Sequence, residues 1–221
     1  MKGVYNLRPP APRYNEMWDA DIVLTFLKHM YPAKKLPLLQ LSMKLAVLIL
    51  LVSGRRGQIL QSLSIDNMMT GRSKIVFNIP ANLAKEGRQG YKVQPLTLKK
   101  FTDKRLCVYN YMQVYLNRTL ELRGNVKQVF ITTKKPHKAV TRDTFSRWVK
   151  QILTEAGIDM TLFKPGSTRS AATSKAFKNG ATIDEILTGG GWSRESTFTK
   201  WYKRPVRKNK ILEDYVLKGQ N

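Results

Sequence analysis

The chain has 221 residues, of which 42% are hydrophobic, so it can bury one large core or two small ones. It carries 39 Lys and Arg against 15 Asp and Glu, a formal net charge of +24 at pH 7, which makes nucleic acid the default partner. An anionic membrane, a ribosomal-type RNA and a merely solvated basic surface are the alternatives. Cys107 is the single cysteine, which excludes an intrachain disulfide and a cysteine-rich metal site, and with two histidines a zinc site is not expected.

The single thiol and the lack of a signal peptide at Met1 predict a reducing interior, the nucleus in a eukaryote and the cytoplasm otherwise. The most apolar stretch, residues 37–52, contains Gln40, Ser42 and Lys44 and is shorter than a membrane span needs. It predicts a buried core helix, and no membrane partner is expected.

Residues 1–17 are rich in proline, which fixes φ and restrains the preceding residue, so we expect an extended lead-in. A helix is predicted to begin at 18–21, where two aspartates supply a cap and an acidic first turn. Apolar residues on one face follow at 22, 23, 26 and 27. A second helix is predicted over 38–51, and it stops at Gly54.

Residues 60–68 lead into a strand predicted over 74–79, and a second alternating segment predicts a strand over 91–98. The glycine-rich, basic segment 85–90 between them predicts the turn of a β-hairpin. Further helices are predicted over 107–123, 141–156, 167–178, 182–187, 193–202 and 210–218, and a short strand over 129–132. The expected fold class is mainly α with a small antiparallel β-sheet or hairpin.

Four segments, in order, hold residues suited to phosphate chemistry: 53–60 with Arg56, the hairpin lysine Lys85, 166–173 with Arg169, and 191–202 with Tyr202. They resemble the active-site motifs of the tyrosine recombinases, the relatives of phage integrases and Xer proteins. Other matching motifs occur in the family's order: Trp18-Asp19, Arg105-Leu-Cys107, Leu122-Arg-Gly124, Phe130-Ile-Thr132, Lys135-Pro-His137, Thr144-Phe-Ser-Arg-Trp148 and Ala156-Gly-Ile158. No single motif is specific, but their joint order over residues 5–206 resembles most the recombinases of DIRS-like and related eukaryotic mobile elements.

The resemblance implies a tyrosine recombinase catalytic-domain fold over 18–206. It also implies a helix or tail over 207–221 that either docks on a neighbouring protomer or closes its own core. Double-stranded DNA would be cleaved and rejoined through a 3′-phosphotyrosyl intermediate, by a homo-oligomer (dimer or tetramer), in the integration of a mobile element. Because the covalent link conserves bond energy, no metal and no cofactor are expected. Family members usually carry an N-terminal helical domain, which we expect to be missing here because the lead-in is short.

Opening a phosphodiester through a tyrosine creates a transition state with extra negative charge on phosphorus-bound oxygens. A planar guanidinium donates two charge-assisted hydrogen bonds to those oxygens and stays protonated. The resemblance assigns this role to Arg56 and Arg169, with Arg55 as the competing choice for the first.

Tyr202 is the implied nucleophile, within a Phe198-x-x-x-Tyr frame; a phenol needs a base or nearby cations to become reactive. Lys85 is implied to protonate the leaving 5′ oxygen, and a contact to the DNA backbone is the alternative. Trp192 stands where the family has His or Trp. Its indole N–H can donate to a phosphate oxygen and its ring can pack under Tyr202, and both fit a structural tryptophan as well.

Gly166 departs from the family pattern, which has a His that helps to remove the tyrosine proton and donates to phosphate. Glycine does neither, and general acid–base help is worth about 10²–10⁴ in rate. Three hypotheses therefore stay open: a slow enzyme, an inactivated form, and a domain retained for DNA binding alone. His137 lies in a predicted loop and is not expected to replace the missing group.

Basic residues near the motifs are predicted to contact DNA phosphates, with an affinity that falls steeply as salt rises: Arg55, Arg88, Lys92, Arg142, Arg147, Lys175 and Arg194. Arg194 and Arg204 also fit simple solvated cations. A type IB topoisomerase-like activity would use the same chemistry. An RNA-binding protein ranks last, because the aromatic motif of an RRM and the loop of a KH domain are both missing.

Overall fold

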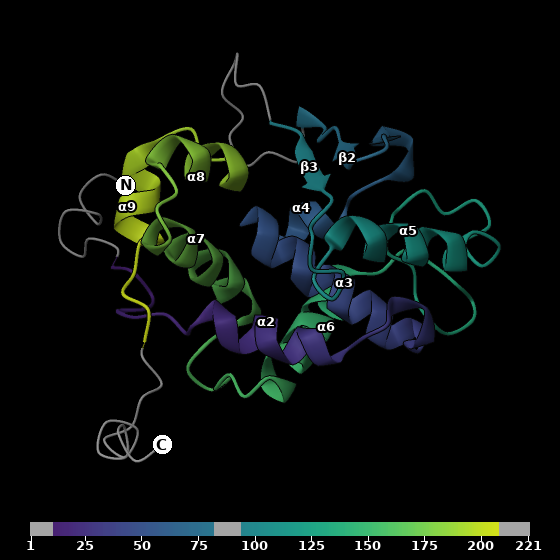
Figure 1. The fold of residues 1–221 in the computed structure, drawn as a ribbon, viewed down its shortest axis with the longest axis horizontal. Coiled ribbons are helices and arrows are strands. Elements are labelled where there is room, and N and C mark those ends of the chain that lie inside the picture. Colours follow the sequence, from purple (N-terminus) through teal and green to yellow (C-terminus); the bar gives the residue numbers. More distant parts are fainter. Residues whose placement is uncertain (1–10, 82–93, 208–221) are drawn as a thin grey trace, which may run out of the picture.

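The structure is a computed structural model that describes residues 11–81 and 94–207. Its elements are α2 (Ala20–His29), α3 (Leu38–Ser53), α4 (Gly57–Gln61), β1 (Met68–Thr70), β2 (Lys74–Phe77), β3 (Leu96–Lys99), α5 (Val108–Thr119), α6 (Arg142–Glu155), α7 (Thr168–Lys178), α8 (Ile183–Gly190) and α9 (Glu195–Trp201) (Figure 1). Short 3-10 helices occupy Ala33–Lys35, Ile65–Asn67 and Pro165–Ser167. The predicted class, mainly α with a small antiparallel sheet, is confirmed.

Helix α3 is the centre of the fold and contacts α4, α5, α6 and α7. Every residue from 41 to 50 is buried, because the helix is apolar around most of its circumference. It ends at Gly54, whose φ of 59° places it in the left-handed conformation while its N–H donates to the carbonyl of Leu50. The prediction of a buried core helix that stops at Gly54 is confirmed.

Lys44 is fully buried in the middle of α3. Its Nζ lies 2.6–2.8 Å from four oxygens: the carbonyls of Leu27, Met30 and Arg105 and the hydroxyl of Tyr111. Burial lowers the pKa of Lys44 to about 7, an effect that Asp103 partly opposes. Burial also raises the pKa of Tyr111 to about 12. This polar centre joins α2, α3 and α5 inside the core.

The sheet has the strand order β1-β2-β3 and is antiparallel. Ile75 pairs with Leu98 and Phe77 with Leu96, so the buried side chains of β2 and β3 share one face. The two hairpin strands are confirmed, although each is shorter than expected, and the segment 85–90 lies outside the described residues. The strand expected over 129–132 is wrong, because Ile131 makes an isolated bridge with Ala139 rather than part of a ladder.

Two short elements, α4 and β1, were not predicted from the sequence. Helix α4 has five residues, too few to show a helical period. Strand β1 has three residues and follows a 3-10 turn that Ser64 caps through the N–H of Asp66. The helix expected over 210–218 lies outside the described residues.

A second, smaller group of buried side chains, here called the C-terminal cluster, lies at the green-to-yellow end of the molecule in Figure 1. Its buried members are Ile186, Trp192 and Phe198. Helix α8 begins with the capping box of Thr182 and Glu185. Helix α7 connects this cluster to the main core, since one part of α7 packs in each.

The described part of the lead-in, residues 11–17, contains no helix. Asp19 caps α2, as predicted, by accepting a hydrogen bond from the N–H of Asp21. Met17 forms a parallel bridge with Val206, so the beginning and the end of the described chain lie side by side.

Within residues 11–81 and 94–207, no helix combines the length and the apolar character that crossing a bilayer requires. The same residues contain no group of three or more His, Cys, Asp or Glu side chains placed to hold a metal ion. Cys107 is buried as a free thiol.

Candidate active site

A cavity of about 320 Å³ opens where α4, α6 and α7 approach the residue that ends α9. Its polar lining includes Arg55, Arg56, Arg142, Gln58, Ser146, Thr168, Arg169 and Tyr202. Among the described lining residues there are four arginines and no carboxylate, so the cavity concentrates positive charge. Gly166 lines it as well. Three of the four motif segments, far apart in sequence, therefore meet in one place.

The turn after α3 delivers two arginines to this cavity. Gly54 makes the turn possible, because its φ is positive and because a Cβ there would lie only 2.8 Å from Cγ2 of Thr173 in α7. Arg56 follows at the N-cap position of α4, half-buried, with part of its surface on the cavity. The close approach of α7 thus brings the segments of Arg56 and Arg169 together.

Arg55 is predicted to contact DNA, but it is only 2% exposed. Its Nη2 donates to the carbonyl of Gln94 at 3.0 Å and to that of Thr188 in α8 at 3.3 Å. The guanidinium therefore connects the turn after α3 with the segment that precedes β3 and with helix α8. Arg55 also lines the cavity, as Arg169 does, so its guanidinium supports the cavity wall, and its predicted contact with DNA stays a prediction.

Arg169 lies in the first turn of α7 and is 3% exposed. Its Cζ is 3.7 Å from the centre of the Trp192 ring and 5.0 Å from that of the Tyr202 ring. The centres of these two rings are 4.8 Å apart. Cation–π contact thus holds the guanidinium against both aromatic residues. The predicted nucleophile and the second predicted arginine are immediate neighbours.

Trp192 packs against Tyr202, which is one of its two predicted roles. Its Nε1 is buried and has no hydrogen-bond partner among the described residues. A buried donor of this kind is expected to find an acceptor, and a ligand oxygen in the site is one candidate. Donation to a phosphate stays a prediction.

The glycines before Trp192 are explained by what surrounds them. A Cβ at Gly190 would overlap the Trp192 ring, and a Cβ at Gly191 would overlap the guanidinium of Arg55. Gly191 also has a φ of 69°, with which it ends α8. The glycine run therefore allows α8 to end directly against the site.

The main chain of Tyr202 is held by α7. The Oγ atoms of Ser170 and Ser174 donate to the carbonyl of Tyr202 at 2.7 and 2.9 Å, and both serines are buried. Tyr202 and Arg169 thus share one helical support. Neither serine was predicted from the sequence, although their four-residue spacing beside Arg169 indicates that they share a helix face.

Gly166 lies in the 3-10 turn before α7 and is exposed. A Cβ at this position would meet no heavy atom within 4 Å, so the space where the family has His is open. The turn itself is anchored, because Oγ of the buried Ser167 accepts a hydrogen bond of 2.8 Å from Nε1 of Trp18. A larger side chain at position 166 would therefore fit on a fixed support.

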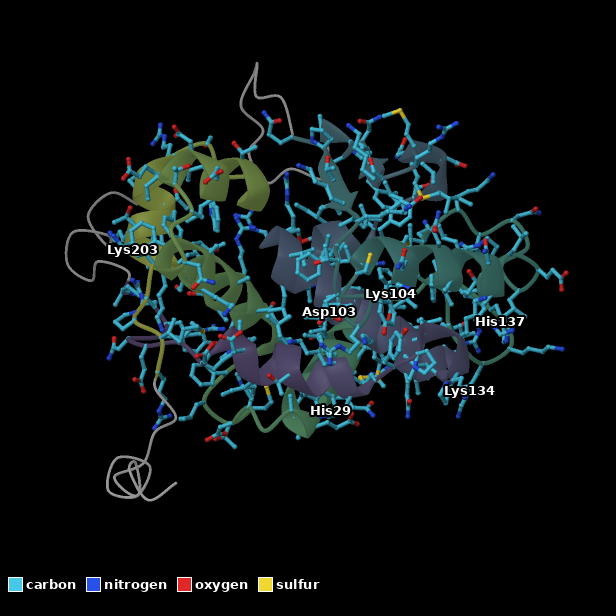
Figure 2. All side chains as sticks on the ribbon, in the orientation of Figure 1. His29, Asp103, Lys104, Lys134, His137 and Lys203 are labelled. Atoms are coloured by element: carbon cyan, nitrogen blue, oxygen red, sulfur yellow. The ribbon has the colours of Figure 1, made fainter. Side chains whose placement is uncertain are left out.

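Neither histidine of the described chain lines the cavity. His137 contacts the carbonyl of Thr132 through Nδ1 at 2.8 Å, and Figure 2 shows it at the opposite end of the molecule from Lys203, the neighbour of Tyr202. His29 is exposed at the end of α2. In this structure His137 lies far from the position of the missing His.

The other predicted DNA contacts fall into three groups. Arg142, Arg147 and Arg194 are exposed, and Arg142 lines the cavity itself. Lys175 instead forms an ion pair of 2.5 Å with Asp21 of α2, so the structure uses it to join two helices. The hairpin residues lie outside the described part of the chain, and their predicted roles stay predictions: Lys85, Arg88 and Lys92.

Chemically, the cavity is suited to a phosphodiester. Arg56 and Arg169 can donate planar pairs of hydrogen bonds to its non-bridging oxygens. Tyr202 supplies a hydroxyl at the same cavity, and its ring lies beside the Arg169 guanidinium. A hydroxyl beside preorganised cationic donors is an arrangement suited to phosphoryl or nucleotidyl transfer.

Comparison with known proteins agrees with this geometry. The phage integrase family matches residues 19–208. The chain is similar in structure to XerA recombinase, with 16% identity and a TM-score of 0.63, over 98% of this chain and 68% of that one. It is similar to the XerH site-specific recombinase bound to its difH substrate (13% identity, TM-score 0.63), over 91% of this chain and 52% of that one. The chain is also similar to lambda integrase 75–356, bound as a dimer to a core site, with 14% identity and a TM-score of 0.57. The similarity covers 96% of this chain and 68% of that one.

No match was found among curated proteins. The chain spans between 52% and 68% of the length of these three recombinases. At such identities the structures establish the fold, which is the tyrosine recombinase catalytic-domain fold, as predicted. Because the family match runs from the cap of α2 to beyond Tyr202, and so covers most of the chain, this protein is a member of the phage integrase family.

Proposed function

We propose that this chain is a tyrosine recombinase domain that cleaves and rejoins double-stranded DNA through Tyr202. The observation that carries the proposal is the meeting of Tyr202, Arg56 and Arg169 at one cavity whose described lining holds no carboxylate. Membership of the phage integrase family implies DNA cleavage and rejoining in recombination. The net charge of +24 supports DNA as the partner.

In the proposed step, the phenolic oxygen of Tyr202 attacks phosphorus, and the new O–P bond forms as the bond from phosphorus to the 5′ oxygen breaks. The proton of Tyr202 passes to water in the open space beside Gly166, and the 5′ oxygen takes a proton from Lys85. Arg56 and Arg169 stabilise the charge that develops on the non-bridging oxygens, where loss of one such donor costs about 10²–10³ in rate. Rejoining reverses the step with the 5′ hydroxyl as nucleophile, so one phosphoester bond is exchanged for another.

We propose further that the chain acts as a homo-oligomer on the DNA of a mobile element, in the nucleus if its source is eukaryotic. The motif resemblance to DIRS-like and related elements supports the setting. Structures of lambda integrase as a dimer on a core site and as a tetramer on a Holliday junction support assembly on DNA. A transposon integrase in complex with transposon end DNA supports the mobile-element context.

Gly166 favours a second candidate, a DNA-binding module of the same fold with weak or no catalysis. The open space at this position contains no side chain to accept the Tyr202 proton. The intact set of Tyr202, Arg56 and Arg169 favours the enzyme. We therefore propose a slow recombinase whose rate is limited by the missing proton acceptor.

The test uses nicked duplexes tiled across the DNA that flanks the chain's own gene, in which cleavage releases a short strand and traps the covalent complex. Wild type, Tyr202→Phe and Gly166→His are compared by the protein–DNA band on a denaturing gel. Imidazole is added to wild type in a parallel series, because the open space beside Gly166 has room for it. DNA affinity is measured for each protein by fluorescence anisotropy.

We expect a slow wild-type band that Tyr202→Phe abolishes, and an increase of about 10²–10⁴ in rate with Gly166→His. Imidazole should accelerate wild type and leave Gly166→His unchanged. DNA binding without a band, even in Gly166→His, would replace the recombinase with the binding module. A band that persists in Tyr202→Phe would contradict the assignment of the nucleophile.

A further inference from the structure

Tyr14, in the lead-in, contacts two segments that flank the candidate site. Its hydroxyl accepts a hydrogen bond of 3.1 Å from the N–H of Lys164, and its ring packs on Phe163 with centres 5.4 Å apart. Its carbonyl accepts a hydrogen bond of 2.8 Å from Nε of Arg204. One residue thus joins the segment before Gly166 to the segment after Tyr202.

Within the described residues, the guanidinium of Arg204 donates all of its hydrogen bonds to carbonyls at this junction. Besides Nε, its Nη1 and Nη2 donate to the carbonyls of Lys203 and Lys200, next to and within α9. Its N–H donates at 3.0 Å to Oγ of Ser174, which also holds the carbonyl of Tyr202. The guanidinium is therefore a bridge between the nucleophile's helix and the lead-in, and not a simple solvated cation.

Neighbouring lead-in residues strengthen the same junction. The N–H of Met17 donates to the carbonyl of Pro205 at 2.8 Å, and the N–H of Arg207 donates to the carbonyl of Met17 at 2.6 Å. Trp18, 3% exposed, donates from Nε1 to Ser167 beside Gly166. We call residues 14–18 with residues 204–207 the clasp.

The C-terminal cluster that surrounds Tyr202 buries few side chains. Its buried residues are Ile186, Trp192 and Phe198, and Tyr202 is half-buried at its edge. Misplacing a reacting group by about 1 Å can cost 10² in rate. A second attachment just beyond the nucleophile therefore has a direct consequence for chemistry.

We propose that Tyr14 is a positioning residue for the cleavage step: through the clasp, the N-terminal segment sets the placement of Tyr202 relative to Gly166 and Arg169. The proposal rests on the proposed function for its catalytic consequence. Its structural part, the restraint of residues 203–207 by the lead-in, stands independently.

The test compares Tyr14→Ala, Tyr14→Phe and Arg204→Gln with Tyr31→Ala, a control at an exposed tyrosine outside the site. Single-turnover formation of the covalent complex is measured at saturating nicked duplex, together with DNA affinity by anisotropy. Both are measured well below the unfolding midpoint of each variant, so that a purely structural role would leave the rate unchanged. Amide hydrogen exchange of a peptide over 203–207 is followed without DNA.

We expect Tyr14→Ala to slow covalent-complex formation by about 10- to 100-fold with unchanged DNA affinity. Tyr14→Phe keeps the ring and should slow it about three-fold. Both Tyr14→Ala and Arg204→Gln should accelerate exchange over 203–207, whereas Tyr31→Ala should change neither quantity. If Tyr14→Ala fails to fold, Arg204→Gln and Tyr14→Phe decide the question.

A wild-type cleavage rate in Tyr14→Ala and Arg204→Gln, with exchange unchanged, would overturn the proposal. If wild type forms no covalent complex at all, the proposed function fails. In that case exchange over 203–207 alone decides the clasp. Faster exchange in the variants supports it and unchanged exchange overturns it.

Discussion

The molecule has two hydrophobic regions of very different size, and the candidate site lies where they meet. The main core surrounds α3, in which every residue from 41 to 50 is buried. The C-terminal cluster has Ile186, Trp192 and Phe198 as its buried residues. Arg56 and Arg169 are carried by elements packed on the first region, whereas Tyr202 packs in the second. Tyr202, the proposed nucleophile, thus lies in the region with less buried surface.

This difference separates stability from site geometry. Local opening takes less free energy where few apolar contacts are buried, so the C-terminal cluster should open before the main core. Changes in the main core should lower the free energy of global unfolding and leave the cleavage rate of the folded protein intact. Changes in the C-terminal cluster should lower the cleavage rate more than global stability.

The largest effect is expected in the main core, from Lys44→Met. The change removes the donor that lies near three carbonyls and Tyr111 Oη, so each of these acceptors loses a hydrogen bond inside the core. We expect a loss of about 3–5 kcal/mol in the free energy of unfolding, measured by urea denaturation. The exposed Lys35→Met serves as control and should change stability by less than about 0.5 kcal/mol. A stability loss no larger than that of the control would show that the buried network contributes little.

Phe198→Ala tests the C-terminal cluster against Leu48→Ala in the main core, since both side chains are fully buried. Each truncation should destabilise the region that contains it by about 3 kcal/mol. In Leu48→Ala the cost should appear in global unfolding, with the rate of covalent-complex formation unchanged. In Phe198→Ala it should appear as faster amide exchange over 195–202 and a slower rate. Equal effects of both variants on the rate would contradict the division into two regions.

Gly190→Ala should have a smaller effect, because the glycine faces the Trp192 ring at a distance that leaves no room for a Cβ. Overpacking of this kind typically costs about 1–3 kcal/mol, and displacement of Trp192 should also reduce the cleavage rate. Gly189→Ala is the matched control, since its Cβ would come no closer than 3.9 Å, to the carbonyl of Ser53. It lies in the same helix and should be neutral or slightly stabilising.

If Gly190→Ala and Gly189→Ala behave alike in stability and rate, the close contact with Trp192 does not limit this position. Intrinsic fluorescence of the protein provides an independent readout. The spectrum should shift with Gly190→Ala and remain unchanged with Gly189→Ala.

The main core could be predicted from the sequence more fully than the connections between regions. Helix α3 is long and apolar, and α2 and α6 have capping side chains at their predicted starts. These are local signals, which a single segment contains. By contrast, α4 is only five residues long, and Ile131 needs Ala139 to form its bridge. Such features depend on partners and leave no periodic pattern.

The site shows the same division. The order of motifs predicted that Arg56, Gly166, Arg169 and Tyr202 form one site, and all four line the cavity. The support around them could not be predicted, because it consists of contacts between distant segments. Ser170 holds a carbonyl 32 residues away, and Tyr14 accepts from a residue 190 positions away. The protein partners of Arg55 and Lys175 could not be predicted for the same reason: each is a main-chain carbonyl or a carboxylate from another element.

The smallest expected effect is the pH dependence of stability that the buried Lys44 causes in the main core. The pKa of Lys44 is lowered by burial from its ordinary value of 10.5 to about 7, so between these values the unfolded chain binds more protons than the folded one. The free energy of unfolding should therefore rise with pH, by about 1 kcal/mol from pH 7 to pH 8. Tyr111 acts in the opposite direction only above pH 10, because burial raises its pKa from 10.0 to about 12. Urea denaturation at both pH values should show the rise in wild type and not in Lys44→Met, whereas an equal slope in the two proteins would assign it to other groups. Since Lys44 contacts neither α8 nor α9, the same change of pH should leave amide exchange in the C-terminal cluster unaltered after correction for the intrinsic exchange rate.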